Sequence, residues 1–325
     1  MAESDGASSA WTKLRVVLSR RIMEGVLVAL CIGLSLRAPH FLTTDNLLNV
    51  LRSISMQALI AFGMTLVIIV GEIDLSVGAA VAFAGCLAAY LVLRGLPIPV
   101  AIALTVLAGT ALGSFTGFMR TRFAVPTFIT TLALFTGLKG GALMLTGGFP
   151  LTPFPAWYEF LGSGYVLGIP FPTLVLVVGF AGIFVLTRYT TFGRAIYAVG
   201  GNREAARLSG IDVSAVRIWT LALTGALAAL SGVMLSARIM SGTPTVAQGW
   251  ELDIIASVII GGTSLSGGSG TVWGTLVGIV FIGVIINGMT LLDIPIFTQY
   301  VVRGLLIFAA VLVNRMQATP TRAEA

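Results

Sequence analysis

Long apolar stretches separated by short polar breaks run along almost the whole chain. A helix needs about 20 mostly apolar residues to cross the hydrocarbon core of a bilayer. Stretches of this kind lie near 22–36, 54–70, 77–93, 96–118, 125–146, 165–187, 214–236, 271–289 and 297–314. A further apolar piece, 251–262, is too short to cross as a straight helix. The pattern therefore predicts an all-α, polytopic integral membrane protein.

The polar breaks between these stretches carry the candidate chemistry. The break 71–78 reads GEIDLSVG, and 251–254 reads ELDI, so both place a Glu and an Asp two positions apart. Transporters built from duplicated halves often have broken segments at matching places, although chance similarity explains a match of this length equally well. A third break, 261–270, reads GGTSLSGGSG and includes Thr263 and Ser264. Its glycines predict a helix break or a re-entrant turn, which a membrane tolerates only inside protein or beside water.

The acids of these breaks allow two interpretations. An ionised carboxylate within a bilayer costs roughly 2.5–3.5 kcal/mol on insertion scales, so it usually faces a cavity or a partner. This favours contact with a substrate or a coupling ion. The alternative is local: Asp74 or Ser76 caps the following helix, and Glu72 bonds to its neighbours. In the same way, Glu251 and Asp253 suit the positive end of a following helix.

Composition agrees with the membrane assignment and excludes most soluble functions. Hydrophobic residues make up 57% of the 325 residues and charged residues 10%, against about 25% charged residues in soluble proteins. The net charge of +6 comes from basic residues scattered singly, which does not indicate nucleic-acid binding. Cys31 and Cys86 lie inside apolar stretches, so no disulfide framework is expected. A single histidine, His40, excludes His-based metal sites and His-dependent triads.

Arginine and lysine predict the orientation, because cytoplasmic loops retain an excess of them. Four regions between or beside the apolar stretches hold 13 of the 19 arginines and lysines: Lys13, Arg15, Arg20, Arg21, Arg120, Arg122, Arg188, Arg194, Arg203, Arg207, Arg217, Arg315 and Arg322. All four are cytoplasmic if 251–262 and 271–289 count as two crossings, for ten crossings in all. The chain then comprises a cytoplasmic segment 1–21, a transmembrane domain 22–314 and a cytoplasmic tail 315–325. The segment 147–164 has no Lys or Arg and lies outside.

The cytoplasmic loop 188–213 has the strongest local signals. Asn202 can cap a short helix with Glu204 in its first turn, and Gly210 can end that helix in the left-handed conformation. A basic, amphipathic helix of about two turns is therefore expected between two membrane spans. Such a helix either rests on anionic lipid headgroups or contacts a soluble partner.

Motifs for nucleotide chemistry are not found. Neither Lys13 nor Lys139 belongs to a G-x-x-x-x-G-K-[ST] loop, so the chain has no Walker A motif. The glycines of 261–270 do not complete G-x-G-x-x-G, because Trp273 occupies the place of the last glycine. We expect no catalytic, cofactor-binding or metal-binding site in this chain.

Three motifs together resemble those of simple-sugar (ribose-type) ABC importer permeases. They are 71–78, the segment 198–211 with its AVGGN and EAARLSGI elements, and WELD at 250–253 leading into GGTSL. The agreement extends from about residue 45 to Asn314. Glu72 departs from it, because relatives often have a small or uncharged residue there. The resemblance makes Ser76, Thr263, Ser264 and the four acids candidate pathway or gating residues.

The resemblance also assigns a role to the loop 188–213. Its EAA-x-x-x-G element is similar to the coupling loops through which importer permeases contact their ATPase. The residues assigned to this contact are Gly200, Gly201, Asn202, Glu204, Ala205, Ala206 and Gly210.

The partners follow from the same resemblance. It implies a homodimer of this chain in the bacterial inner membrane and a cytoplasmic ABC ATPase subunit that binds ATP and Mg²⁺. It also implies a periplasmic or lipid-anchored binding protein that delivers a ribose-like monosaccharide or a related polyol. Other interpretations are an importer permease for branched-chain amino acids or nucleosides, and a secondary transporter or channel. A secondary transporter or channel would need an ionisable group in mid-span, for which Lys139 is the clearest candidate. A scaffold subunit without a transport role is a more distant alternative.

Overall fold

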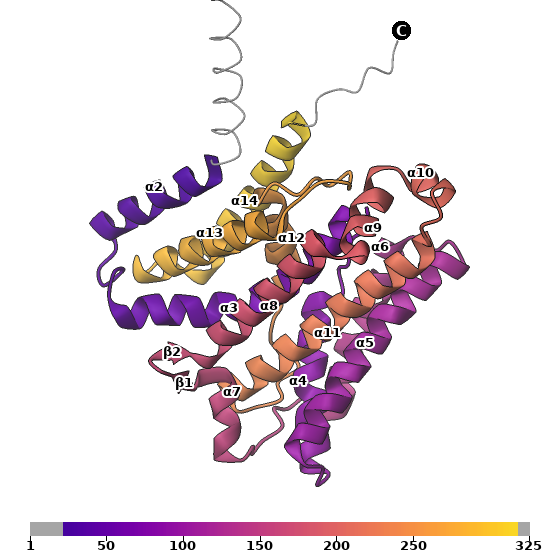
Figure 1. Ribbon diagram of the computed structural model, residues 1–325. Helices are drawn as coiled ribbons and strands as arrows, with labels where there is room; N and C mark the ends of the chain where they lie inside the picture. The colour runs from indigo at the N-terminus through magenta and orange to yellow at the C-terminus, as the bar shows by residue number, and fades with distance from the viewer. Residues whose placement is uncertain (1–21, 318–325) are drawn as a thin grey trace, which may run out of the picture.

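Each predicted apolar stretch forms a helix in the computed structural model, which describes residues 22–317 (Figure 1). These helices are α2 (Ile22–Arg37), α3 (Thr44–Ile69), α4 (Val77–Leu93), α5 (Ile98–Arg122), α6 (Thr127–Thr146), α8 (Phe171–Tyr189), α11 (Val213–Ile239), α12 (Trp250–Ile260), α13 (Val272–Leu291) and α14 (Ile296–Gln317). Among the described helices, α3, α5, α6, α8, α11 and α13 are long and apolar enough to cross a membrane. The helical, polytopic architecture is confirmed, and the count of ten crossings stays a prediction.

Parts of the predicted topology cannot be compared with the structure. The N-terminal segment 1–21, with Lys13, Arg15, Arg20 and Arg21, lies outside the described residues. Of the predicted tail 315–325, residues 318–325 also lie outside the described residues, and helix α14 continues to Gln317.

Two element boundaries differ from the expected ones. Helix α3 begins at Thr44, well before the apolar run at 54, because Thr43 caps it by accepting a hydrogen bond from the amide of Asn46. The expected span 165–187 instead opens with a small antiparallel hairpin of β1 (Tyr165–Val166) and β2 (Ile169–Pro170). The hairpin follows a 3-10 helix, η1 (Ala156–Glu159), and the short helix α7 (Phe160–Ser163). Apolar residues alone therefore overestimated the length of α8.

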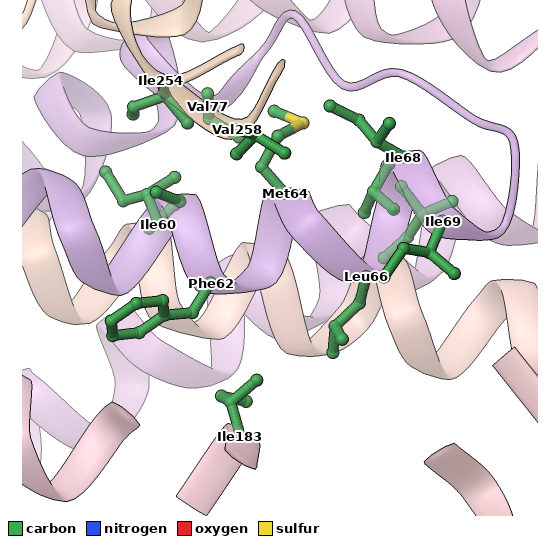
Figure 2. Close-up of a cluster of buried hydrophobic side chains, with 14 of the residues drawn as sticks. Ile60, Phe62, Met64, Leu66, Ile68, Ile69, Val77, Ile183, Ile254 and Val258 are labelled. Atoms are coloured by element: carbon green, nitrogen blue, oxygen red, sulfur yellow. The ribbon is translucent and has the colours of Figure 1, made fainter. Parts of the chain in front are cut away.

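Helix α3 lies at the centre of the described fold. Its most apolar window is 83% buried inside the chain, against 28% for α5 and 22% for both α6 and α8. Figure 2 shows the reason, since α3 carries large apolar side chains on more than one face, with Phe62 pointing toward Ile183 of α8. On another side lie Val77 of α4 and two residues of α12, Ile254 and Val258. Helices α5, α6 and α8 leave most of their surface to lipid or to partner chains.

Helices α5 and α11 approach each other closely along a row of small residues. A Cβ atom on Gly113 would lie 2.1 Å from the carbonyl oxygen of Leu221, and one on Gly109 would lie 2.5 Å from that of Gly225. Gly117 packs against the backbone of Ile218 in the same way. Small residues allow helix backbones in membranes to come this close, and packing is what holds such helices together. We call this contact the α5–α11 seam.

Candidate functional site

The loop 188–213 folds into two short helices, α9 (Thr191–Gly201) and α10 (Arg203–Leu208). The predicted short helix is α10: the Asn202 side chain accepts a hydrogen bond from the amide of Ala205 at 3.0 Å, and Gly210 has a φ of 83°. Helix α9 was not predicted, although Thr190 caps it by accepting from the amide of Gly193. We call 191–210 the α9–α10 segment.

The α9–α10 segment packs directly against two of the polar breaks. A Cβ atom on Gly200 would lie 1.8 Å from the carbonyl oxygen of Ile69, at the end of α3. The amide of Gly268, in the glycine-rich break, donates to that same carbonyl at 2.8 Å. The Tyr197 hydroxyl donates to the carbonyl of Gly270 at 2.9 Å. The segment therefore touches both the end of α3 and the break between α12 and α13.

Helix α10 presents an exposed surface away from these contacts. Leu208 at its end is 77% exposed. Glu204 and Arg207 form an exposed ion pair of 2.6 Å, and the hydrogen bond from Arg207 holds the pKa of the Glu204 carboxyl below its usual value. An exposed leucine beside charged side chains suits a contact with a further protein. Ala205 belongs to this helix, and Ala206 is its buried residue.

Glu72 is the centre of a cluster that the sequence did not predict. Its carboxylate is buried, and Oε1 lies 2.9 Å from Arg120 Nε, 3.2 Å from Arg217 Nε and 3.4 Å from Arg203 Nη2. The Thr127 hydroxyl donates to Oε2 at 2.8 Å. We call Glu72 with its three arginines the Glu72 cluster. The Glu72 carboxylate bonds to these side chains rather than capping a helix.

The Glu72 cluster joins segments that are far apart in the sequence. Glu72 lies between α3 and α4, Arg120 in the last turn of α5, and Arg203 at the start of α10. Arg217 lies in the first turns of α11. Three guanidinium groups face one carboxylate, so the cluster has net positive charge. The α9–α10 segment is therefore tied electrostatically to the same junction against which Gly200 packs.

Asp74 and Asp253 have different environments. Asp74 Oδ1 accepts from the amide of Ser76 at 2.8 Å and from its hydroxyl at 2.6 Å. Ser76 itself makes no side-chain bond to the start of α4, so the predicted capping of that helix is replaced by a local turn. Asp253 is buried in the first turn of α12 and pairs with Arg303 of α14 at 3.3 Å.

The two Glu-x-Asp breaks lie against each other in space. A Cβ atom on Gly78 would lie 2.1 Å from Glu251 Oε2, so only glycine fits there without a shift. This oxygen is buried and has no hydrogen-bond partner among the described residues. The break 261–270 forms the expected turn, in which Ser264 accepts from the amide of Ser266. Thr263 is buried in the same turn.

A cavity of about 110 Å³ lies where the two Glu-x-Asp breaks meet. Its walls come from α4, from α6 and from the loop before α12, and include Gly78, Phe135, Lys139, Ala247, Gln248 and Gly249. Lys139 lies near the middle of α6 and is exposed in the single chain. A lysine in mid-bilayer costs roughly 2.5–3.5 kcal/mol on insertion scales. We therefore expect this face of α6 to meet water or protein rather than lipid.

Comparison with known proteins identifies relatives over nearly the whole chain. A model of the family described as "Branched-chain amino acid transport system / permease component" matches residues 46–311. The chain is 44% identical over 294 residues to the ribose import permease protein RbsC of Bacillus subtilis, covering 90% of this chain and 91% of that protein. No solved structure matches it.

Two further relatives are named for other sugars. The L-arabinose ABC transporter permease protein AraH of Azospirillum brasilense is 37% identical over 307 residues, covering 94% of this chain and 91% of the relative. The xylose transport system permease protein XylH of Haemophilus influenzae is 35% identical over 337 residues, covering 84% and 90%.

Proposed function

Because the chain belongs to the branched-chain amino acid transport system permease family, we propose that it is the membrane-spanning permease subunit of an ATP-binding-cassette importer. Its cargo is a simple sugar of the ribose, arabinose or xylose type. The observation that carries this proposal is the similarity, over nearly the whole chain, to permeases named for these three sugars. The broken helices around α12 agree with it, since irregular backbone within a membrane lines a cavity or is buried in protein.

The energy for transport comes from a separate ATPase subunit, which binds ATP and Mg²⁺. The α9–α10 segment is the contact with that subunit, and Gly200, Gly201, Asn202, Glu204, Ala205, Ala206 and Gly210 belong to it. Two observations support this role: the exposed Leu208 at the end of α10, and the packing of Gly200 against the end of α3. A movement of α10 would be transmitted to the α3–α4 junction through this packing and through the Glu72 cluster.

The pathway passes near the two Glu-x-Asp breaks. Asp74, Ser76, Glu251 and Asp253 are its candidate polar residues, together with Thr263 and Ser264 of the glycine-rich break. The position of the two breaks supports this assignment, because Gly78 of the first break packs on Glu251 of the second. Glu72 is better placed as a link to the α9–α10 segment than as a pathway residue.

The assembly is a homodimer in the bacterial inner membrane, served by a periplasmic or lipid-anchored binding protein that delivers the sugar. The exposed position of Lys139 on α6 supports the presence of a second copy, because a charged side chain there is unfavourable next to lipid and a second copy would shield it. Ten crossings with both termini in the cytoplasm complete the arrangement.

Reconstitution tests the proposed function. The chain is placed in liposomes with its ATPase and its binding protein, and uptake of D-ribose, L-arabinose and D-xylose is compared with uptake of L-leucine. We expect ATP-dependent uptake of at least one sugar and none of L-leucine. Uptake of L-leucine alone would assign the chain to amino-acid import. Uptake driven by an ion gradient without the ATPase would assign it to secondary transport.

A further inference from the structure

We propose that the cavity between α4, α6 and the loop before α12 is a sugar-binding site on the translocation pathway, in which Phe135, Lys139 and Gln248 contact the sugar. This inference rests on the proposed function, because it names the place where the transported sugar touches this chain. It gives Lys139 a role that differs from the coupling group of a secondary transporter.

The position of Lys139 shows that the cavity opens to an aqueous or protein-lined space. It is the one charged residue of α6, it lies about two turns from the nearer helix end, and it is exposed in the single chain. A lysine near the end of a helix reaches the interface with its long side chain, but one in the middle needs water or a polar partner at its own depth. The space beside Lys139 is therefore suited to a polar solute.

The wall of the cavity has the chemistry that a monosaccharide needs. A sugar presents hydroxyl groups, which donate and accept hydrogen bonds, and apolar patches of C–H groups. The Lys139 ammonium donates, the Gln248 amide both donates and accepts, and the Phe135 ring offers an apolar face. Small-molecule sites are mostly apolar with a few convergent polar groups, and this cavity follows that pattern.

The size of the cavity agrees with weak binding of a small solute. A volume of about 110 Å³ is room for a few groups of the size of water, whose share of the liquid is about 30 Å³. Part of a monosaccharide ring fits, and the remainder reaches the open side.

The cavity is also connected to the parts that we expect to move. Gly78 and Gly249 line it, at the starts of α4 and α12. Gly249 has a φ of 81° and Ala247 a φ of 57°, so the loop before α12 is sharply bent at this wall. Gly78 follows Glu72 in the same break, and the Glu72 cluster holds α10. A shift of α10 would therefore change the shape of the site.

Two variants and one matched control test the site by transport. Lys139→Met and Gln248→Leu keep an apolar side chain of similar bulk but remove the hydrogen-bonding groups. Thr136→Val, the control, removes a hydroxyl one turn away on α6 that does not line the cavity. For the sugar that the wild-type complex transports, we expect uptake per reconstituted permease to fall about tenfold in the first two, as the loss of a hydrogen bond to a charged or amide group implies. Thr136→Val should match the wild type, and ATP hydrolysis stimulated by the loaded binding protein should persist in all three.

A labelling experiment reads occupancy directly. Val246→Cys, at a wall position to which we assign no contact with the sugar, is made in a background with Cys31→Ala and Cys86→Ala. Its reaction with a thiol reagent is followed with and without excess of the transported sugar. Protection by that sugar, together with the fall in uptake, supports the site. Unchanged uptake in both variants overturns it, and so does reduced uptake without protection, which would mean a structural role. If the wild-type complex transports none of the three sugars, the proposed function fails, whatever the variants do.

Discussion

At the scale of single residues, Glu72 has the largest predicted effect on the cytoplasmic end of the fold. It is the one carboxylate among three arginines, and Arg217 is almost as buried as Glu72, with 10% of its side chain exposed. Removing one partner of a buried ion pair costs about 3–5 kcal/mol, because the charges left behind are desolvated and unpaired. The arginines would also repel one another.

We therefore expect Glu72→Gln to lower both stability and coupling. The thermal midpoint of the purified protein in detergent should fall, with a loss of about 3–5 kcal/mol in the free energy of unfolding, and sugar-stimulated ATP hydrolysis should fall with it. Glu159→Gln is the control, since that exposed carboxylate lies in the segment 147–164. A Glu72→Gln protein with wild-type stability would show that the cluster contributes nothing.

Asp74 and Asp253 should respond differently to the same change. In Asp74→Asn the amide oxygen can still accept both bonds from Ser76, so uptake should stay near that of the wild type. Asp253→Asn loses its ion pair with Arg303, for which we expect a fall in uptake of about tenfold. Uptake normalised to membrane abundance measures both. A large effect of Asp74→Asn with none of Asp253→Asn would contradict this expectation. It would mean that Asp74 needs its negative charge and that the pair between Asp253 and Arg303 does not matter for uptake.

The residues that were predictable are those with local signals. Asn202 as a cap and Gly210 in the left-handed conformation follow from neighbours within one or two turns, and both are found. The arginine partners of Glu72 come from α5, α10 and α11, and no spacing rule brings them together. One signal was present, because a glutamate at the junction of two apolar stretches needs a compensating charge.

At the scale of elements, the contact between the α9–α10 segment and the end of α3 depends on a missing side chain. Gly200 approaches the carbonyl of Ile69 so closely that a methyl group cannot fit without a backbone shift. The adjacent Gly201 has nothing within 4 Å of the position of its Cβ. The two glycines form a matched pair within one helix.

We expect Gly200→Ala to separate α9 from α3 and to uncouple ATP hydrolysis from uptake. Gly201→Ala adds the same methyl group in open space and should leave the thermal midpoint near that of the wild type. Melting in detergent and the ratio of sugar taken up to ATP hydrolysed check the pair. Equal behaviour of the two variants would mean that the close packing at Gly200 is not needed for stability or for coupling.

The long helices could be predicted because a bilayer requires them to be continuous and apolar. The elements that were missed lack this signal. The first turns of α3, TDNLLNV, mix polar and apolar residues, and the hairpin β1–β2 is made mostly of apolar residues that resemble part of a span. The sequence of helix α9 contains three glycines, which lower helix propensity, and its amphipathic pattern is too short to distinguish a helix from a loop.

At the scale of the whole molecule, the fold places the basic α9–α10 segment and the aromatic segment 147–164 near opposite ends of α11. Figure 1 shows α10 near one end of α5 and α11, and α7 near the other. Helix α11 has 27 residues, which at 1.5 Å each is about 40 Å, close to the thickness of a bilayer with its headgroups. We therefore expect the basic α9–α10 segment and the aromatic segment 147–164 to lie on opposite sides of the membrane.

Labelling of single cysteines checks this orientation. With Cys31 and Cys86 replaced by Ala, Leu208→Cys and Trp157→Cys both introduce an exposed thiol, at positions that are 77% and 55% exposed. A reagent that cannot cross the membrane should label position 157 in intact cells and position 208 only after lysis. Labelling of position 208 in intact cells would reverse the topology.

The α5–α11 seam has a mechanical consequence for how access alternates. With backbone against backbone at three glycines of α5, the two helices cannot slide without separating, so they form one stiff frame. Arg120 and Arg217 both belong to that frame, and their Nε atoms lie 2.9 and 3.2 Å from Glu72 Oε1. Arg203 belongs to α10 instead; its side chain is 44% exposed and its Nη2 lies 3.4 Å from the same oxygen. If the α9–α10 segment moves when the partner ATPase acts, we expect this frame to stay in place. Arg203 makes the longest and most exposed of the three pairs, so we expect it to separate from Glu72 first, while Glu72 keeps its other two partners.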